Sequence, residues 1–139
     1  MQSSVSPQEY ADAMLRDDAT KKALGIEVLS VAEGRARLQL VVRADMVNGH
    51  AIAHGGIIAS LADTAFAVAC NTYGEATVAS GFSIEFLEPG HLGDELVAEA
   101  VEVVRRGRSG VYDVTVTRGD TVIATFRGRS RSLGRPIEL

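Results

Sequence analysis

The sequence predicts an α+β fold in which one long apolar helix lies on an antiparallel β-sheet. Residues 54–70 (HGGIIASLADTAFAVAC) read as one continuous helix, with apolar residues on nearly every side. Two segments with strand character precede this helix and four follow it, separated by short turn sequences. An antiparallel sheet must cover its apolar face, and this is the one long apolar helix that the sequence offers for that purpose.

The chain begins with helical signals and then changes to the strand period. Ser6 at a cap position, followed by Pro7 and Glu9, forms a capping box that predicts a helix through about Arg16. The segment ATKKAL adds a further turn that ends at Gly25, so residues 1–24 form an N-terminal helical segment. Polar and apolar residues then alternate in GRARLQLVV, which predicts a half-buried strand. Residues 25–32 are its expected hairpin partner.

The second half of the sequence reads as strands alone. Turn signals occur in EPGHLGD, RRGRSG and RGDT. The expected strands between them are 77–87, 95–105, 111–117 and 122–133. No internal repeat, low-complexity tract or linker interrupts the sequence, so we expect residues 1–139 to form a single domain.

Composition restricts the class of protein. Hydrophobic residues make up 46% and charged residues 23%, as in ordinary globular domains, and no apolar run approaches the ~20 residues of a membrane span. The N-terminus lacks the pattern of a signal peptide, and one cysteine provides no disulfide framework. We therefore expect a cytoplasmic protein without membrane association.

Charge is distributed unevenly along the chain. From Arg105 onward eight arginines face three acidic residues, a net +5, while residues 1–104 carry −9. Nucleic-acid binding is a poor explanation, because the chain as a whole is acidic and its basic residues are not interleaved with aromatic ones. A small ligand with several phosphates suits this local basic surface, although a solvated strand face also carries arginines.

The long helix has two unequal sides on a helical wheel. Apolar residues fill one broad half: Ile57, Ile58, Leu61, Ala62, Ala65, Phe66, Val68 and Ala69. The opposite, narrow stripe contains Gly56, Ser60, Asp63, Thr64, Ala67 and Asn71. Small residues permit close approach of a second surface, so we expect Asp63 to face an interface or a cleft.

Two features of this helix are chemically suggestive. The helix begins at His54-Gly55-Gly56, where the two glycines have no side chains to block the backbone. The free N–H groups of this first turn form a plausible oxyanion hole. Gly55 and Asp63 are eight residues apart, about 12 Å on a helix, whereas a base must lie within ~3 Å of its target. If both act on one substrate, they come from different subunits, and the sequence then predicts a dimer with shared sites.

The segments NGHAIAHGGIIASLADTAFAVACN, VASGFSIEFLEPGHLGDELVAEA and GVYDVTV resemble hotdog-fold acyl-CoA thioesterases, in particular the phenylacetic-acid-degradation type. The resemblance extends from about Ala23 to Leu133. It implies a long central helix wrapped by a curved antiparallel β-sheet, and a homo-oligomer of dimers with a continuous sheet, often paired into tetramers. It also implies active sites between subunits that hydrolyse an aryl- or medium-chain acyl-CoA to a free acid and CoA.

The resemblance assigns roles to individual residues. Asp63 occupies the position of the catalytic carboxylate, and Gly55 provides the N–H that polarises the thioester carbonyl. Asn48 helps to hold the attacking water, His54 shapes the oxyanion loop, and Thr64 is the polar residue beside the acid. Asp63 either attacks the carbonyl or deprotonates water, and we favour the second route. Without the surrounding motif, Asp63 reads as an interface hydrogen-bonding residue and Asn48-Gly49 as a turn.

The phosphates of coenzyme A are expected ligands for the basic C-terminal part of the chain, because arginine makes bidentate contacts with phosphate. Two groups of residues are expected to contact phosphates or pantetheine: the turn formed by Arg106, Arg108, Ser109 and Gly110, and the strand face of Arg127, Arg129 and Arg131. One or two of these arginines suffice. Coenzyme A enters as part of the substrate, and no cofactor is expected.

Other interpretations are weaker. The pair His50 and His54 suggests a metal site with Asp63, but Gly55-Gly56 place both histidines before the helix, so we predict no metal. Cys70 reads as a buried free cysteine. Within the hotdog fold, an enoyl-CoA hydratase or dehydratase pairs an acid with a helix histidine, which this helix lacks after Gly55. A non-catalytic acyl-CoA-binding module also remains open, as do the acyl preference and the tetramer arrangement.

Overall fold

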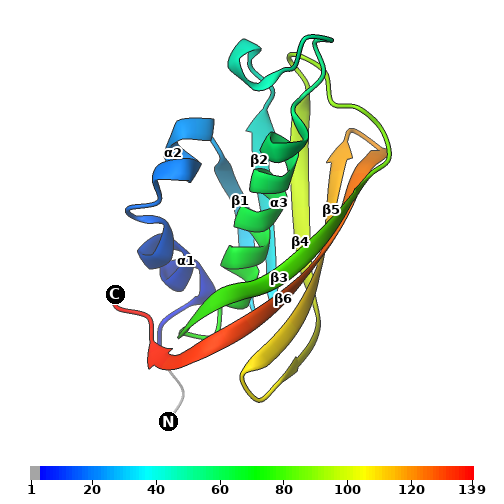
Figure 1. Ribbon diagram of the computed structural model, residues 1–139. Coiled ribbons are helices and arrows are strands. Elements are labelled where there is room, and N and C mark those ends of the chain that lie inside the picture. The colour runs from blue at the N-terminus through cyan, green and yellow to red at the C-terminus, as the bar shows by residue number, and fades with distance from the viewer. Residues whose placement is uncertain (1–3) are drawn as a thin grey trace.

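The computed structural model describes residues 4–139 and contains a six-stranded antiparallel sheet curved around one long helix (Figure 1). The helices are α1 (Pro7–Leu15), α2 (Ala19–Leu24) and α3 (Gly55–Cys70), with a 3₁₀ turn η1 (Ala44–Met46). The strands are β1 (Glu27–Ala32), β2 (Arg35–Val41), β3 (Glu75–Phe86), β4 (Glu95–Arg106), β5 (Ser109–Arg118) and β6 (Thr121–Pro136). Their order in the sheet is β1-β2-β4-β5-β6-β3. The expected α+β hotdog architecture is confirmed.

The core lies between α3 and the concave face of the sheet. The apolar half of α3 is buried there against β2, β4 and β5. Its central side chain is Phe66, whose ring packs 5.7 Å from those of Tyr112 and Phe126. Gly128 of β6 leaves room for this ring, since a Cβ there would lie 2.8 Å from Phe66. The broad apolar side predicted for the helix is therefore the side that the sheet covers.

The narrow stripe of α3 differs from the prediction at two positions. Thr64 and Asn71 were expected in the uncovered stripe, but both are buried. Their polar groups are satisfied by the helix backbone: Thr64 Oγ1 donates to the carbonyl of Ser60 at 2.7 Å, and Asn71 Nδ2 donates to that of Ala67 at 2.8 Å. The uncovered stripe consequently contains Gly56, Ser60, Asp63 and Ala67.

The predicted strands are all present, with changes at their ends. The turn expected at residues 105–110 is tighter, because Arg106 pairs with Ser109 and only Gly107 and Arg108 lie between β4 and β5. Gly110 was wrongly placed in that turn. It is buried in β5, where a Cβ would meet Ser130 Oγ at 2.7 Å, so packing explains the glycine.

Strand β3 forms one edge of the sheet. Among the described strands it pairs only with β6, although it is 12 residues long. Phe82, Ile84 and Phe86 face the same side as α3, because Ile84 lies opposite the core residue Phe126. Phe82 stacks on Phe126 at 4.7 Å and remains 44% exposed. A long edge strand with exposed aromatic residues is unusual for a monomer, because it presents unpaired backbone and apolar surface together.

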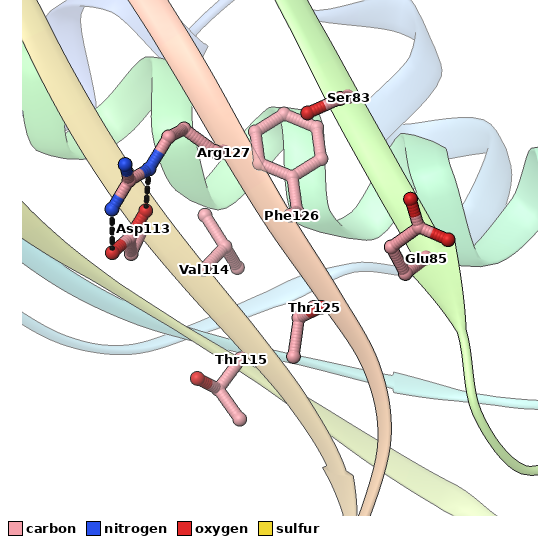
Figure 2. A pocket seen from close by; sticks show the side chains of 8 residues that line it. All are labelled: Ser83, Glu85, Asp113, Val114, Thr115, Thr125, Phe126 and Arg127. Carbon is pink, nitrogen blue, oxygen red and sulfur yellow. Dashed lines mark hydrogen bonds and ion pairs between the residues drawn. The ribbon is translucent and has the colours of Figure 1, made fainter.

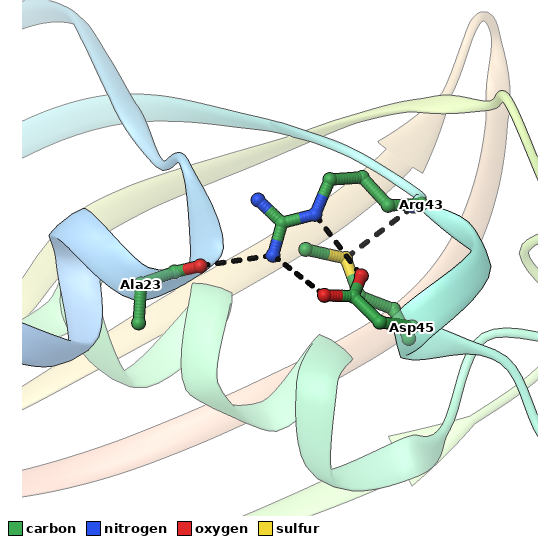
Figure 3. Close-up of polar contacts among 4 residues, drawn as sticks. Ala23, Arg43 and Asp45 are labelled. Atoms are coloured by element: carbon green, nitrogen blue, oxygen red, sulfur yellow. Dashed lines mark hydrogen bonds and ion pairs between the residues drawn. The ribbon is translucent and has the colours of Figure 1, made fainter.

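The N-terminal helices α1 and α2 lie on the β1 side of the sheet, where α1 packs against β1 (Figure 1). The predicted capping box is present, since Ser6 and Glu9 bond each other's backbone N–H groups. Arg43 joins α2 to the segment before α3: its Nη2 donates to the carbonyl of Ala23 at 2.9 Å, and its Nε pairs with Asp45 at 3.1 Å (Figure 3). Within residues 4–139, no helix is long and apolar enough to cross a membrane.

Candidate active site

The first turn of α3 presents one free backbone donor. His54 caps the helix, and its Nδ1 accepts the N–H of Gly56 at 3.3 Å. No residue in the described range 4–139 accepts the N–H of Gly55. Since the helix dipole adds partial positive charge at this end, the Gly55 N–H suits a developing oxyanion. The two glycines thus differ in a way that the sequence does not reveal.

An apolar cleft adjoins this donor. Its volume is about 380 Å³, and it is lined by Ile52, Ala53, Gly55, Ile58, Phe86, Leu87, Glu88 and Pro89. Phe86 reaches it from the edge strand β3, and the end of its ring lies against Gly55. Sequence reasoning missed Phe86. Strand alternation could have placed it on the α3 side of the sheet, but only the register between β3 and β6 brings the ring to the helix terminus.

Asn48 lies in the loop that leads to α3. Its Oδ1 accepts two backbone N–H groups, from His50 at 2.8 Å and from Ile52 at 3.3 Å. Ala51 in the same loop has a φ of +59°, a conformation that costs a non-glycine residue energy. The Asn48 oxygen is therefore occupied in shaping the loop, whereas its Nδ2 group bonds to no other residue within the described part of the chain.

Asp63 is half-buried on the uncovered stripe, as predicted. Among residues 4–139, its carboxylate forms no hydrogen bond or ion pair. Burial raises the pKa of Asp63, and the nearby negative charge of Asp18 raises it further. A carboxylate that is unpaired, partly desolvated and shifted in this direction is a better base near neutral pH than an ordinary aspartate.

Gly55 and Asp63 do not come together within one chain. Both belong to the uninterrupted helix α3, so their separation of eight residues corresponds to about 12 Å. The hydroxyl of Thr64, next to the acid, is directed to the carbonyl of Ser60 rather than to the uncovered side. Within residues 4–139, one chain therefore holds a free backbone donor and an unpaired carboxylate without bringing them together.

The candidate phosphate-binding arginines occupy other parts of the sheet. Arg127 is already engaged, because its Nε and Nη2 bond both oxygens of Asp113 at 2.7 and 2.8 Å on the outer face of the sheet (Figure 2). This contact lowers the pKa of Asp113. The guanidinium of Arg129 lies over Gly81 of β3, where a Cβ would be only 2.7 Å away. Arg129 forms no ion pair with any residue in 4–139.

The turn between β4 and β5 is remote from Gly55 of the same chain. Strand β5 runs from this turn to Arg118, which donates to the carbonyl of Pro89 in the segment that lines the cleft. Ten residues of strand span roughly 30 Å. Arg106, Arg108 and Ser109 therefore lie at the opposite end of the sheet from the oxyanion donor. A single chain does not bring these two groups together.

Other candidate chemistry finds less support. In the described part of the chain, no three His, Cys, Asp or Glu residues are grouped as metal ligands. His50 and His54 both precede α3, as expected. Cys70 is buried at the end of α3, and burial raises the pKa of its thiol to about 12, so it stays protonated at neutral pH.

Known proteins resemble this chain over most of its length. The model of the thioesterase superfamily matches residues 50–125. The chain is 49% identical to the acyl-coenzyme A thioesterase PaaI of Escherichia coli over 131 residues, 93% of either chain. The solved structure of the E. coli PaaI protein, from the phenylacetic acid degradation operon, superimposes with a TM-score of 0.92 at 45% identity, covering 95% of this chain and 96% of that one. A Streptococcus mutans protein solved with acetyl-CoA gives a TM-score of 0.76 at 27% identity, covering 80% and 90%.

Proposed function

Since the chain belongs to the thioesterase superfamily, we propose that it hydrolyses acyl-CoA thioesters to a free acid and CoA. The similarity to PaaI supports an aryl or medium-length acyl group such as phenylacetyl. The observation that carries the proposal is Asp63, an unpaired carboxylate with a raised pKa on the same helix as a free oxyanion donor. Hydrolysis of a thioester needs these two groups and water, and no metal or redox cofactor. The reaction takes place in the cytoplasm.

The site is completed by a second copy of the chain. Strand β3 offers an unpaired edge of 12 residues, and the uncovered stripe of α3 consists of small residues around Asp63. Edge-to-edge pairing of two β3 strands continues the sheet and sets the two α3 helices side by side. In an antiparallel arrangement, Gly55 of one subunit approaches Asp63 of the partner subunit. By family resemblance, two such dimers form a tetramer.

Each residue then has a defined step. The Gly55 N–H donates to the thioester carbonyl oxygen, and Asp63 of the partner subunit takes a proton from water, whose oxygen attacks the carbonyl carbon. The tetrahedral intermediate collapses as the C–S bond breaks, and CoA leaves as a thiolate that is protonated by solvent. Asn48 Nδ2 holds the water. His54 keeps the Gly56 N–H occupied, and Thr64 fixes the backbone behind the acid.

The CoA phosphates bind to the arginines that have no internal partner. Arg106, Arg108 and Arg129 are exposed and form no ion pair within residues 4–139, whereas Arg127 is engaged by Asp113. Because the β4–β5 turn is far from Gly55 of its own chain, its arginines serve a CoA whose thioester reacts at the Gly55 of the partner subunit. Ser109 and Gly110 contribute backbone to the same end of the sheet.

The test is release of CoA from phenylacetyl-, hexanoyl- and acetyl-CoA, measured with a thiol reagent and corrected for Cys70. Asp63→Asn is expected to lower kcat by at least ~100-fold with folding and assembly unchanged. Gly55→Pro removes the N–H and adds a ring against Phe86; proline is accepted at the first position of a helix, and the expected loss is ~10²–10³-fold. Gly55→Ala is the matched control, since it adds bulk against Phe86 but keeps the donor.

Two results would contradict the proposal. If the wild type releases CoA from none of these thioesters, hydrolysis is not its activity, and unchanged acyl-CoA binding by Asp63→Asn would then identify a binding module. If Gly55→Pro and Gly55→Ala lose activity equally, the effect comes from crowding of Phe86, and the N–H of Gly55 has no part in the reaction.

A further inference from the structure

Resting on the proposed function, we propose that Phe86 selects the acyl group by stacking against an aromatic ring one or two carbons from the thioester carbonyl. The end of the Phe86 ring lies against Gly55: its Cζ, Cε2 and Cε1 are 3.1, 3.5 and 3.6 Å from the position of a Cβ on that glycine. The residue proposed as the oxyanion donor thus has an aromatic side chain from another element beside it, with too little room for an unstrained Cβ between them.

The exposure of Phe86 leaves room for such a ligand. Although its ring touches α3, the side chain is 51% exposed, and it forms a wall of the cleft together with Ile52, Ile58 and Leu87. A cavity of about 150 Å³ already accommodates benzene, and this open cleft measures about 380 Å³. An aryl group therefore fits beside the ring without displacing the residues that hold it.

The distance from donor to ring determines which acyl groups benefit. A carbonyl oxygen bonded to the Gly55 N–H, at about 2.9 Å, is held at the residue against which the Phe86 ring end lies. An aryl group joined through one or two methylene carbons reaches offset stacking, with ring centroids about 4.5–7 Å apart. An acetyl group has no ring to stack. A flexible alkyl chain gains apolar contact but no aromatic pairing.

The cleft also disfavours one kind of substrate. Glu88 is the charged side chain among the residues that line it, and it follows the apolar pair Phe86 and Leu87. A carboxylate at the far end of an acyl group would enter an apolar cleft beside this like charge, which opposes its binding. The cleft therefore favours neutral aromatic acyl groups and disfavours acyl groups that carry a second carboxylate.

The experiment compares kcat/KM for phenylacetyl-CoA with that for hexanoyl-CoA in the intact enzyme. Phe86→Leu keeps an apolar side chain but removes the ring, so the aryl-to-alkyl ratio is expected to fall about 3- to 10-fold. Phe86→Tyr retains the ring and is expected to keep the ratio. Phe82→Leu is the matched control: Phe82 is a similarly exposed phenylalanine on the same face of β3, about 13 Å from Phe86 along the strand.

The outcomes separate this inference from the proposed function. If the wild type hydrolyses both thioesters and Asp63→Asn hydrolyses neither, but Phe86→Leu keeps the wild-type ratio, the inference on Phe86 fails and hydrolysis stands. The same holds if Phe82→Leu lowers the ratio as much. Light scattering is measured on every variant. If Phe86→Leu and Phe86→Met both change the oligomeric state and leave the ratio unaltered, the ring belongs to the subunit interface, and acyl recognition by Phe86 is refuted.

Discussion

If each active site uses Gly55 from one subunit and Asp63 from the other, two inactive variants will restore activity when their subunits are combined. In a hybrid of Asp63→Asn and Gly55→Pro chains, the Asp63→Asn chain keeps an intact Gly55 and the Gly55→Pro chain keeps an intact Asp63. The site formed by these two residues is complete, and the second site of the hybrid lacks both. Neither variant assembled with itself contains a complete site.

The magnitude follows from the geometry of α3. About 12 Å separates Gly55 from Asp63 within a chain, four times the ~3 Å over which a base acts, so self-complementation within one chain is excluded. Random assembly of equal amounts makes about half of the dimers hybrid, each with one working site of two, which gives about one quarter of the wild-type activity. Each variant alone retains ~1% or less. The expected gain is therefore about 25-fold.

The assay mixes the two variants in urea, dilutes them together to refold, and measures CoA release. Native mass spectrometry counts the hybrids, and variants refolded separately and mixed afterwards provide the control. The shared site would be refuted if a sample shown to contain hybrids had only the average activity of the Asp63→Asn and Gly55→Pro variants assembled separately. A tetramer built from two dimers is also expected to have one quarter of the wild-type activity, because each active site still lies between the two subunits of one dimer.

Three further predictions concern the acid, the core and the basic surface. Asp18→Asn keeps a good N-cap for α2 but removes the charge that raises the pKa of Asp63, so the acid limb of the kcat/KM profile moves to lower pH; an unmoved limb would contradict this coupling. Gly128→Ala forces a methyl to within 2.8 Å of the Phe66 ring and is expected to lower the free energy of unfolding by about 1–3 kcal/mol, whereas an unchanged urea midpoint would disprove the packing. Arg129→Ala is expected to raise KM for acyl-CoA but not for an acyl-N-acetylcysteamine thioester, which lacks phosphates; equal effects on both substrates would exclude phosphate binding.

The sequence predicts the architecture well because the signals are local. The capping box at Ser6, the glycine pair before α3 and the alternation in the strands each depend on residues a few positions apart. The separation of Gly55 from Asp63 is equally readable, because a continuous helix converts eight residues into a distance. The element order and the positions of the two candidate site residues therefore follow without knowledge of tertiary contacts.

What the sequence leaves open depends on pairing between distant segments. Gly110 resembles a turn residue until β5 is seen to pack it against Ser130, and Thr64 resembles an exposed polar residue until its hydroxyl is found on the Ser60 carbonyl. The contact of Phe86 with Gly55 joins residues 31 positions apart and requires the register of β3 on β6. The pattern of apolar residues in an edge strand does not predict its register when both of its faces contain apolar residues.

Three features that are unfavourable in an isolated chain become favourable in the proposed dimer. Within residues 4–139, the long β3 edge is unpaired, which favours uncontrolled association, and the half-buried carboxylate of Asp63 lacks a hydrogen-bond partner. Phe82 and Phe86 leave apolar surface in water. In the proposed dimer, pairing through β3 covers the edge and the ring of Phe82, leaves the cleft beside Phe86 to the acyl group, and places Asp63 beside a substrate held at the partner's Gly55. Substrate and water then supply the polar contacts that the isolated carboxylate lacks. In the proposed dimer, the same contacts stabilise the fold and create the catalytic site, so a substitution that blocks β3 pairing is expected to abolish turnover even where Gly55 and Asp63 are intact.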